Sequence, residues 1–466
     1  MRRNGGIEMR INTTEGPIWR HLLRFFFPIL LGTFFQQLYN TVDAIIVGNF
    51  VGKEALAAVG GATSVLINFL VNLFVGLSSG ATVIVAQYYG ARCHQEMRRT
   101  VHTSIALAIA AGLGVMVLGV LLSGPVLTLM GTTSDVIGYA KTYLQVYFLG
   151  SVASFLYNIG SSILRAVGDN RRPLYFLIAA CLTNIVLDLL FVVVLGLEVL
   201  GVALATVLSQ VVSAVLVMAA LCKPDSIFCV RWQELRFHGD ILKSVVRIGL
   251  PAGLQSDMYT LSNILIQACI NSFGTDTVAA WTAFGKLDAF YWLISAAFGV
   301  AITTFVGQNF GARAYGRVKK SVWVCSAMAL GTAALVSTLF CLAPDPLLRL
   351  FSSDDGVLAI GTRMLWRMTP FYFLFVPVEI MAGGIRGTGD SVKPMLLTCG
   401  GVCVLRVIWI FTVLPRNNTL NTLLLSYPIT WGITSALFLV YYLRGNWLRR
   451  QIAKAGVPAE QPTLAP

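Results

Sequence analysis

The stretch FPILLGTFFQQLYNTVDAIIVG, residues 27–48, is long and apolar enough to cross a bilayer, yet it contains polar side chains. Gln36, Asn40 and Asp43 are spaced i, i+4 and i+7, so a helix would place them in one stripe. An aspartate at membrane depth costs on the order of 2.5–3.5 kcal/mol by insertion scales, so Asp43 should face protein or water. The stretch predicts a membrane-spanning helix with a functional acid, in which Pro28 either bends the helix or occupies its first turn. The alternative for Asp43 is a position at the helix end, near the membrane surface.

The composition of the whole chain is that of a polytopic membrane protein. Of its 466 residues, 56% are hydrophobic and only 12% are charged, whereas soluble domains are about 25% charged. The nine cysteines are scattered and show neither a disulfide framework nor the spacing of a metal site. The sequence contains no P-loop, so we expect no transport driven by bound ATP.

Apolar spans of about the 20 residues that a bilayer requires recur along the chain. We expect twelve of them, at residues 22–47, 55–85, 101–122, 139–164, 174–195, 201–221, 248–271, 278–306, 321–342, 364–385, 394–414 and 421–443. With a cytoplasmic N-terminus, 26 of the 34 Lys and Arg residues lie inside and only 6 lie in the outside loops. This asymmetry predicts that both termini are cytoplasmic. The net charge of +13 then reflects membrane topology rather than nucleic-acid binding.

The sequence also repeats itself. Three segments of the first half recur in the second half in the same order: 27–40 at 250–263, AQYYGAR (86–92) at GQNFGAR (307–313), and LRAVGDNRRP (164–173) at IRGTGDSVKP (385–394). Each half has an even number of spans, so both halves enter the membrane from the same side, which predicts a parallel repeat. In the third segment, an Arg and an Asp flank Gly168 or Gly389, a pattern that predicts a helix cap and a tight loop.

The repeat predicts an all-α protein of two six-helix lobes with a cleft between them, an architecture suited to alternating access. The predicted parts are a cytoplasmic N-terminal segment (1–20), an N-lobe (21–222), a cytoplasmic linker (223–247), a C-lobe (248–445) and a cytoplasmic tail (446–466). The end of the tail, residues 455–466, is expected to be disordered.

Polar residues inside the spans are the candidate site. Asn184 and Asp188 are spaced i, i+4 on the fifth span, and Thr206 on the sixth adds a hydroxyl. Carboxylate, amide and hydroxyl oxygens suit alkali cations, and a buried carboxylate suits a proton equally well. The residues therefore leave H⁺ and Na⁺ both open. A structural hydrogen bond between helices is the alternative for Asn184 and Asp188.

Other polar residues of the spans are candidates for lining a substrate cavity: Gln36, Tyr39, Asn40, Asn158, Asp257, Lys286, Asp288 and Glu379. Lys286 and Asp288 are spaced i, i+2 and point to different helix faces, so Lys286 would require another buried partner. Asp257 and Glu379 are the options, and an ion pair that holds the C-lobe together is as reasonable as substrate contact.

The two lobes differ in their acids. By the repeat, the counterpart of Asp43 is Ile266 or Gln267, and the counterpart of Asp188 is Trp409. We therefore expect the N-lobe to handle the coupling ion and the C-lobe to shape the substrate cavity.

These motifs together resemble the multidrug and toxic compound extrusion (MATE) antiporters, over residues 20–445. The resemblance implies a twelve-helix, two-lobe exporter of the MOP superfamily in the cell membrane, a monomer that exchanges H⁺ or Na⁺ for amphiphilic, often cationic molecules. It implies no cofactor besides the ion and a helix bend at Pro28. Carried over from the DinF-type branch, the ion-coupling residues are Asp43, Asn184, Asp188 and Thr206, which would also be the ligands of Na⁺. The chain departs from the NorM-type branch, because Thr260 stands where that branch has a glutamate.

Two alternatives remain. A lipid-linked oligosaccharide flippase of the same superfamily would need a cavity lined with Arg or Lys, and the spans contain only Lys286 and Arg406. A membrane enzyme would show a nucleophile with its base or a metal cluster, and a non-transporting scaffold would tolerate loss of the buried acids. The sequence shows no such catalytic pattern, so we expect no enzyme.

Overall fold

The computed structural model describes residues 13–224 and 226–454, so the predicted disordered tail at 455–466 lies outside the described residues. The described residues form helices and no strands, and they divide into two compact units. Unit 1 comprises residues 13–16 and 23–253, and unit 2 comprises residues 17–22 and 254–454. The predicted all-α membrane fold is confirmed.

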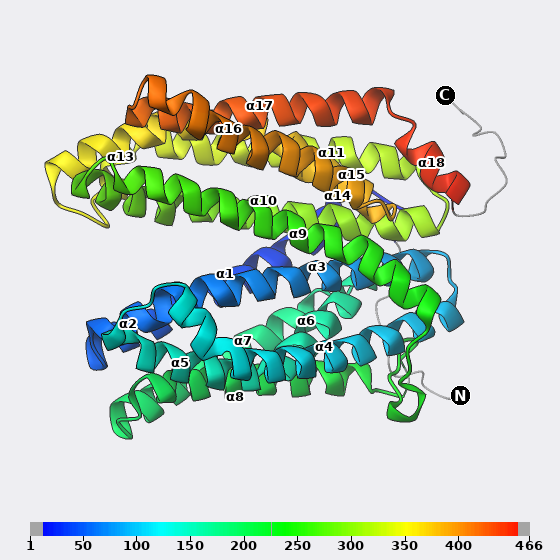
Figure 1. Cartoon of the computed structure of the whole chain (residues 1–466). Helices are drawn as coiled ribbons and strands as arrows, with labels where there is room; N and C mark the ends of the chain where they lie inside the picture. The colour runs from blue at the N-terminus through cyan, green and yellow to red at the C-terminus, as the bar shows by residue number, and fades with distance from the viewer. Residues whose placement is uncertain (1–12, 225, 455–466) are drawn as a thin grey trace. The chain divides into compact units, whose positions relative to one another are not determined.

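Unit 1 contains most of the first helix and all helices of the first repeat (Figure 1). They are α1 (Ile18–Phe50), α2 (Lys53–Gly60), α3 (Ala62–Gly90), α4 (His94–Leu129), α5 (Ser134–Leu149), α6 (Ser151–Ala166), α7 (Arg171–Asp188), the π-helix η1 (Leu189–Val194) and α8 (Glu198–Leu221). Within the unit, α7 packs along α8, and α6 packs against α3, α4 and α8. Pro28 lies inside α1, which is helical on both sides of it.

Unit 2 contains the second repeat. Its helices are the second half of α9 (Gly239–Asn271), then α10 (Thr275–Gly311), α11 (Tyr315–Leu342), α12 (Pro344–Leu348), α13 (Asp355–Met368), η3 (Thr369–Leu374), α14 (Val376–Gly387), α15 (Val392–Thr398), the π-helix η4 (Cys399–Val404), α16 (Leu405–Thr412), η5 (Leu414–Arg416), α17 (Leu420–Arg444) and α18 (Trp447–Lys454). Here α14 packs against α10, α11 and α17.

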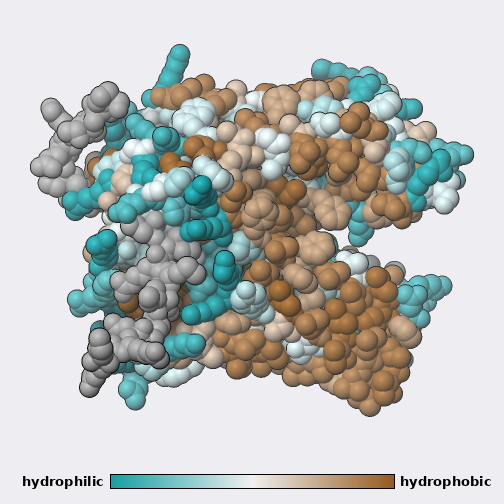
Figure 2. Space-filling view, turned by 180° about the vertical axis from the view of Figure 1, so that it is seen from behind, coloured by the Kyte–Doolittle hydropathy of each residue, from teal (hydrophilic) through white to brown (hydrophobic). Residues whose placement is uncertain are grey.

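Ten helical segments of the described residues are long and apolar enough to cross a membrane, and the pair α5 and α6, bent by 51°, would be an eleventh. The seventh predicted span lies in α9, which has 33 residues but does not belong to this apolar set because Gln255, Asp257 and Asn263 make it more polar. In each unit, hydrophilic side chains gather at one end of the helices, and apolar side chains cover most of the remaining length in this view (Figure 2). Large apolar side chains such as Leu121, Leu335 and Phe411 are at least two-thirds exposed, as a lipid-facing surface requires.

The repeat is visible in the backbone. Arg92 and Arg313 occupy equivalent positions after α3 and α10, and both adopt the left-handed conformation, with φ of 58° and 59°. Gly168 and Gly389 are also equivalent, with φ of 94° and 98°. Left-handed residues of this kind terminate helices. The duplicated segments therefore form duplicated helix ends.

The acids beside these glycines cap the following helices. Asp169 Oδ1 accepts a hydrogen bond from the Arg172 amide at 3.2 Å, and Asp390 Oδ1 accepts one from the Lys393 amide at 3.3 Å. The preceding arginines bind elsewhere: Arg165 donates to Ser162 Oγ at 3.0 Å, and Arg386 donates to Gln255 Oε1 at 3.2 Å. The predicted cap and tight loop are present, but each acid acts without its arginine.

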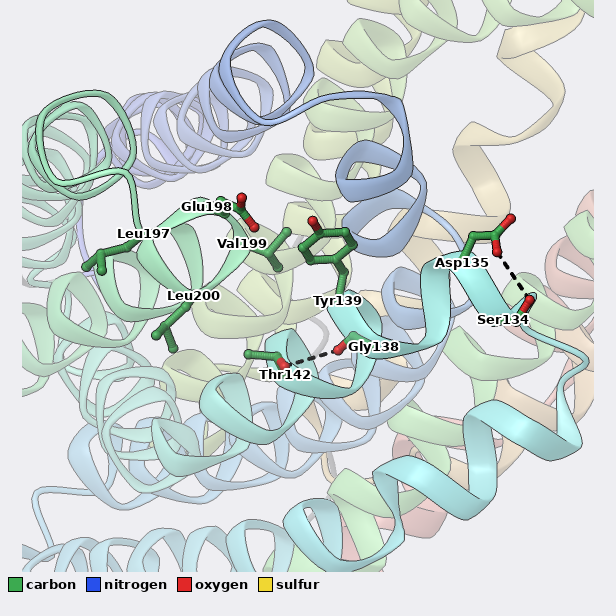
Figure 3. A pocket seen from close by; sticks show the side chains of 9 residues that line it. All are labelled: Ser134, Asp135, Gly138, Tyr139, Thr142, Leu197, Glu198, Val199 and Leu200. Atoms are coloured by element: carbon green, nitrogen blue, oxygen red, sulfur yellow. Dashed lines mark hydrogen bonds between the residues drawn. The ribbon is translucent and has the colours of Figure 1, made fainter.

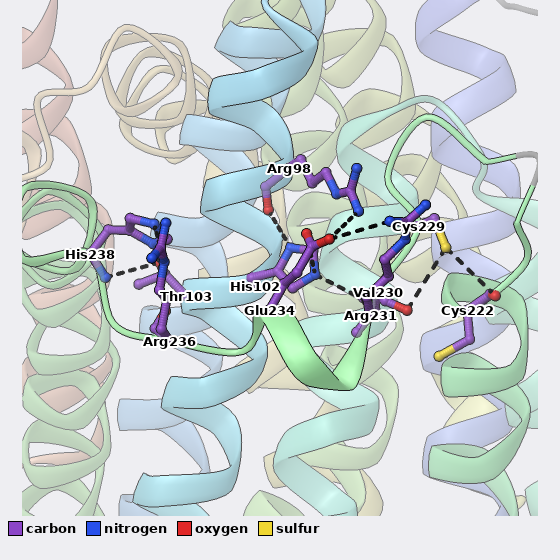
Figure 4. Close-up of polar contacts among 10 residues, drawn as sticks. All are labelled: Arg98, His102, Thr103, Cys222, Cys229, Val230, Arg231, Glu234, Arg236 and His238. Atoms are coloured by element: carbon purple, nitrogen blue, oxygen red, sulfur yellow. Dashed lines mark hydrogen bonds and ion pairs between the residues drawn. The ribbon is translucent and has the colours of Figure 1, made fainter.

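The predicted linker is fastened to α4 of unit 1 (Figure 4). His102 is 2% exposed; its Nε2 accepts the Arg231 amide at 3.0 Å, and its Nδ1 lies 2.8 Å from the Arg98 carbonyl. Arg98 in turn pairs with Glu234 at 2.7 Å. The second part of the predicted linker, from Gly239, is already the beginning of α9.

The first half of α9 belongs to unit 1 and lies against α3 through glycines of both helices. A Cβ on Gly76 would lie 2.2 Å from the Gly253 amide nitrogen, and a Cβ on Gly249 would lie 2.6 Å from Leu77 Cα. Small residues spaced by four permit such backbone contact between membrane helices. The chain passes from unit 1 to unit 2 immediately afterwards, between Gly253 and Leu254.

Candidate functional site

The four residues predicted to bind the coupling ion come together inside unit 1. Asp43 on α1 is 5% exposed, and its Oδ2 accepts a hydrogen bond from the Thr206 hydroxyl on α8 at 3.4 Å. Asp188, the last residue of α7, and Asn184, one turn earlier, are completely buried. The side chains of both lie near the Asp43 carboxyl without forming a hydrogen bond to it. The first helix, α1, thus meets the much later helices α7 and α8 at one acid pair.

The polar atoms of this group, which we call the acid pair site, are largely unsatisfied. Asp43 Oδ1, both Asp188 carboxyl oxygens and both polar atoms of the Asn184 amide have no hydrogen-bond partner among the described residues. A buried polar group without a partner is costly, and a pair of buried carboxylates without a counter-charge is more so. The oxygens present are those that bind a proton or an alkali cation. The donor set therefore fits a coupling ion.

A buried apolar cluster lies one turn beyond Asp43 on α1. Ile46 and Val47 of α1 pack in it with Tyr143 of α5 and Val202 of α8. The Tyr143 ring stacks on Tyr147, with 6.2 Å between ring centroids. Such surroundings exclude water and strengthen any charge interaction at the acids. Composition alone did not single out these neighbours, because the spans are rich in similar side chains.

The polar stripe of the first span does not act as one group. Asp43 is buried, whereas Gln36 and Asn40 are exposed and Tyr39 is half-buried. Asn158, the fourth-span candidate, donates to the Ser154 carbonyl of its own helix at 2.8 Å. The structure therefore does not bring Gln36, Asn40 or Asn158 to the acids.

A second cluster of polar side chains lies around Asp288 in unit 2. It accepts hydrogen bonds from the Tyr372 hydroxyl at 2.5 Å and from the Trp292 indole at 2.6 Å. Glu379 on α14 lies over α10, because a Cβ added to Gly299 would fall 2.0 Å from its Oε1. Asp257 on α9 is 2% exposed. Tyr372 could not be selected from the sequence, because no sequence pattern distinguishes a tyrosine that binds a buried acid from other tyrosines.

The expectation for Lys286 was wrong. Its side chain is exposed rather than buried, so it does not require Asp257 or Glu379 as a partner. The i, i+2 spacing correctly separated it from Asp288 but could not tell which of the two faced inward.

A pocket lies between the beginnings of α5 and α8 in unit 1 (Figure 3). Its volume is about 420 Å³, and it is lined by Ser134, Asp135, Gly138, Tyr139, Thr142, Leu197, Glu198, Val199 and Leu200. Two carboxylates, Asp135 and Glu198, give it an acidic character. It contains none of the residues of the acid pair site.

Comparison with known proteins finds the same duplication. The protein-family model MatE matches the chain twice, at residues 28–190 and 251–412. The probable multidrug resistance protein YpnP of Bacillus subtilis (strain 168) is 29% identical over 442 residues, which cover 93% of this chain and 97% of that protein. The probable multidrug resistance protein YoeA of the same strain is 26% identical over 448 residues, with coverage of 94% and 96%.

Solved structures share the fold. An outward-facing multidrug resistance MATE family transporter of the MOP superfamily superimposes with a TM-score of 0.88 at 23% identity, and covers 96% of this chain and 100% of that one. A MATE structure in the bent conformation has a TM-score of 0.87, with 95% and 98% covered.

Proposed function

Because the chain belongs to the MatE family, we propose that it is a secondary antiporter that exports small amphiphilic, often cationic molecules in exchange for H⁺ or Na⁺. Members of this family are transporters rather than enzymes. The multidrug resistance relatives support the substrate class and do not favour the flippase or scaffold alternatives.

The acid pair site is the observation that carries the proposal. It places two carboxyl groups in an apolar environment inside a membrane protein and leaves most of their oxygens without protein partners. Intramembrane acids of this kind mark ion pathways and proton relays. A bound Na⁺ would be coordinated by carboxylate oxygens of Asp43 and Asp188 and by the amide oxygen of Asn184, with the Thr206 hydroxyl as a fourth oxygen ligand, whereas a proton would be held by the two carboxyl groups.

Coupling follows from linkage. An ion that binds the acid pair site more tightly in one conformation shifts the population toward that conformation, and a substrate that prefers another shifts it back. Exchange of the two ligands then alternates the side of the membrane to which the substrate site opens. The required difference in affinity is large, because moving an equilibrium from 1:99 to 99:1 takes about 5.5 kcal/mol.

We assign the substrate cavity to unit 2, where Asp288 and the surrounding aromatic rings offer a charge and flat apolar surfaces. The protein would work as a monomer in the cell membrane, with both termini in the cytoplasm and with no cofactor besides the coupling ion. The excess of Lys and Arg on one side of the predicted spans supports this orientation.

The test is transport by the purified protein in liposomes. A pH gradient in Na⁺-free buffer and a Na⁺ gradient at symmetric pH are imposed separately, and efflux of ethidium is followed by fluorescence. We expect one gradient to drive efflux by the wild type. At the same ion concentration, both Asp43→Asn and Asp188→Asn should show little efflux, because the ion binds them more weakly.

Asp135→Asn provides the matched control, because it removes an exposed carboxylate of the same unit. It should transport like the wild type. Undiminished efflux in both site variants would refute the role of the acid pair site. Absence of gradient-driven movement of any amphiphile would refute the antiporter.

A further inference from the structure

Unit 2 carries a buried arginine where unit 1 carries none. By the sequence repeat, Arg406 on α16 corresponds to Ile185, the neighbour of Asn184 on α7, and Asn263 on α9 corresponds to Asn40 on α1. The helices that build the acid pair site in unit 1 therefore have counterparts in unit 2 that meet at Asn263 and Arg406. The same helices therefore meet at a cation in unit 2, at positions other than those of the acids in unit 1.

The Arg406 guanidinium is held by little protein. Its side chain is 2% exposed, and its carbon Cζ lies 4.0 Å from the centre of the Tyr427 ring. Nη1 donates to Asn263 Oδ1 at 3.5 Å, and Nε has no hydrogen-bond partner among the described residues. A guanidinium has five N–H donors. Most of its hydrogen-bonding capacity is unused.

No carboxylate neutralises this cation within the described residues. Two acids of the same unit, Asp288 and Glu379, are candidate partners, and Asp288 instead accepts hydrogen bonds from Tyr372 and Trp292. Neither acid forms an ion pair with Arg406 among the described residues. A buried charge without a partner is strongly unfavourable, particularly within a membrane. A planar anion would supply the missing partner, since the fork of an arginine matches a carboxylate with two parallel hydrogen bonds.

The side chain that hydrogen-bonds to Arg406 lies at the protein surface. Asn263, whose contact is the long one at 3.5 Å, is itself exposed. An anionic group that displaced this amide would reach the guanidinium while the Tyr427 ring stayed beneath its face.

Aromatic rings connect Arg406 to the acid of the same unit. The Tyr427 ring lies 5.6 Å from Trp431, and Trp431 lies 6.2 Å from Tyr372 and 5.9 Å from Trp292, centre to centre. Tyr372 and Trp292 are the two residues that donate to Asp288. Opposite charges thus stand at the two ends of one aromatic cluster.

We propose that Arg406 binds an anionic group, a carboxylate, of the transported molecule, so that unit 2 accepts zwitterionic and acidic amphiphiles as well as cations. This inference rests on the proposed function, of which it specifies the substrate class. Asp288 stands at the other end of the aromatic cluster for a positive group of the same molecule.

Equilibrium binding tests the assignment without any ion gradient, so its outcome is independent of whether transport is observed. Rhodamine 110, which has a free carboxylate, and rhodamine 123, its methyl ester, differ only at the group in question. Fluorescence polarisation with the purified protein in neutral phosphatidylcholine nanodiscs should show tighter binding of rhodamine 110. Arg406→Gln should weaken the binding of rhodamine 110 by about tenfold (~1.4 kcal/mol) and leave the binding of rhodamine 123 unchanged.

Two further variants separate recognition from packing. Arg406→Lys keeps the charge without the planar fork and should retain part of the preference. Arg386→Gln removes a half-buried arginine of unit 2, one that is already bonded to Gln255, and should keep the preference intact. If Arg406→Gln weakened the binding of both dyes equally, or if the wild type showed no preference between them, the proposal would be overturned.

A phospholipid is the other source of an anion. If phosphatidylglycerol in the nanodisc abolishes rhodamine 110 binding in the wild type and not in Arg406→Gln, the site belongs to a lipid headgroup and the proposal fails.

Discussion

Units 1 and 2 are built from the same helices yet carry opposite charges where those helices meet. In unit 1 the first and fifth spans of the repeat bring together Asp43 and Asp188, and in unit 2 their counterparts bring together Asn263 and Arg406. The helix ends, by contrast, are nearly identical, down to the left-handed arginines Arg92 and Arg313. The duplication therefore preserved the backbone signals and changed the side chains that face inward. The proposed binding of a cation in unit 1 and of a carboxylate in unit 2 rests on this difference.

The largest effect is expected from transferring the charge of unit 2 into unit 1. Ile185→Arg places a permanent guanidinium beside Asn184, where Arg406 stands in unit 2. The arginine would compensate the acids and compete with the coupling ion, so we expect gradient-driven ethidium efflux in liposomes to fall to background. Ile185→Leu, which changes shape without charge, should remain active. Full activity of Ile185→Arg would show that this position lies apart from the ion.

A carboxylate substitution in each unit separates ion binding from substrate binding. Asp188→Asn should raise the ion concentration required for half-maximal efflux by on the order of 100-fold, since hydrogen bonds and ligand contacts to charged groups contribute about 1.5–3 kcal/mol. Asp288→Asn should leave that concentration unchanged and weaken binding of a cationic dye. Efflux rates measured against ion and dye concentration check both. The division of labour fails if Asp288→Asn shifts the ion dependence as far as Asp188→Asn does.

The close packing of α9 against α3 in unit 1 gives a prediction about stability. Gly249→Leu forces a side chain against the α3 backbone at Leu77, and overpacking of this kind costs about 1–3 kcal/mol. Gly285 on α10 has no atom within 4 Å of an added Cβ, so Gly285→Ala should be neutral or stabilising. Thermal unfolding followed by intrinsic fluorescence in detergent distinguishes the two. Equal melting temperatures would contradict the close contact of α3 and α9.

The smallest effect is expected at Thr206. Thr206→Val removes the hydroxyl that donates to Asp43 at 3.4 Å, a bond worth about 0.5–1.5 kcal/mol. The apparent ion affinity should fall by roughly two- to tenfold, and Thr206→Ser should restore it. Ion titrations of dye efflux provide the measurement, and a valine variant with wild-type affinity would remove Thr206 from the ion site.

Much of the fold was predictable because membrane-spanning helices can be recognised in the sequence as long apolar stretches. The lipid core requires about 20 apolar residues in each crossing helix, so span positions follow from the sequence even where α9 proves too polar to satisfy a hydropathy criterion. The acid pair was predictable for the same reason, since an aspartate in such a stretch has few stable environments.

The orientation of side chains around each helix was less predictable. The spacing of Gln36, Asn40 and Asp43 indicates a shared stripe, yet only Asp43 is buried, because α7 and α8 cover one part of that stripe. The spacing of Lys286 and Asp288 also did not indicate which of the two side chains is exposed. The structure shows that it is Lys286.

The amino-acid sequence by itself determined that the protein is helical, membrane-spanning and duplicated, and that its intramembrane acids are unequal between the halves. These properties depend on composition and periodicity, which each segment carries alone. Only the tertiary structure decided that Asp43, Asn184, Asp188 and Thr206 share one site and that Arg406 is buried without a carboxylate partner among the described residues. The physical reason is that satisfaction of a buried polar atom depends on which other helices surround it, and that is a property of packing rather than of any one stretch.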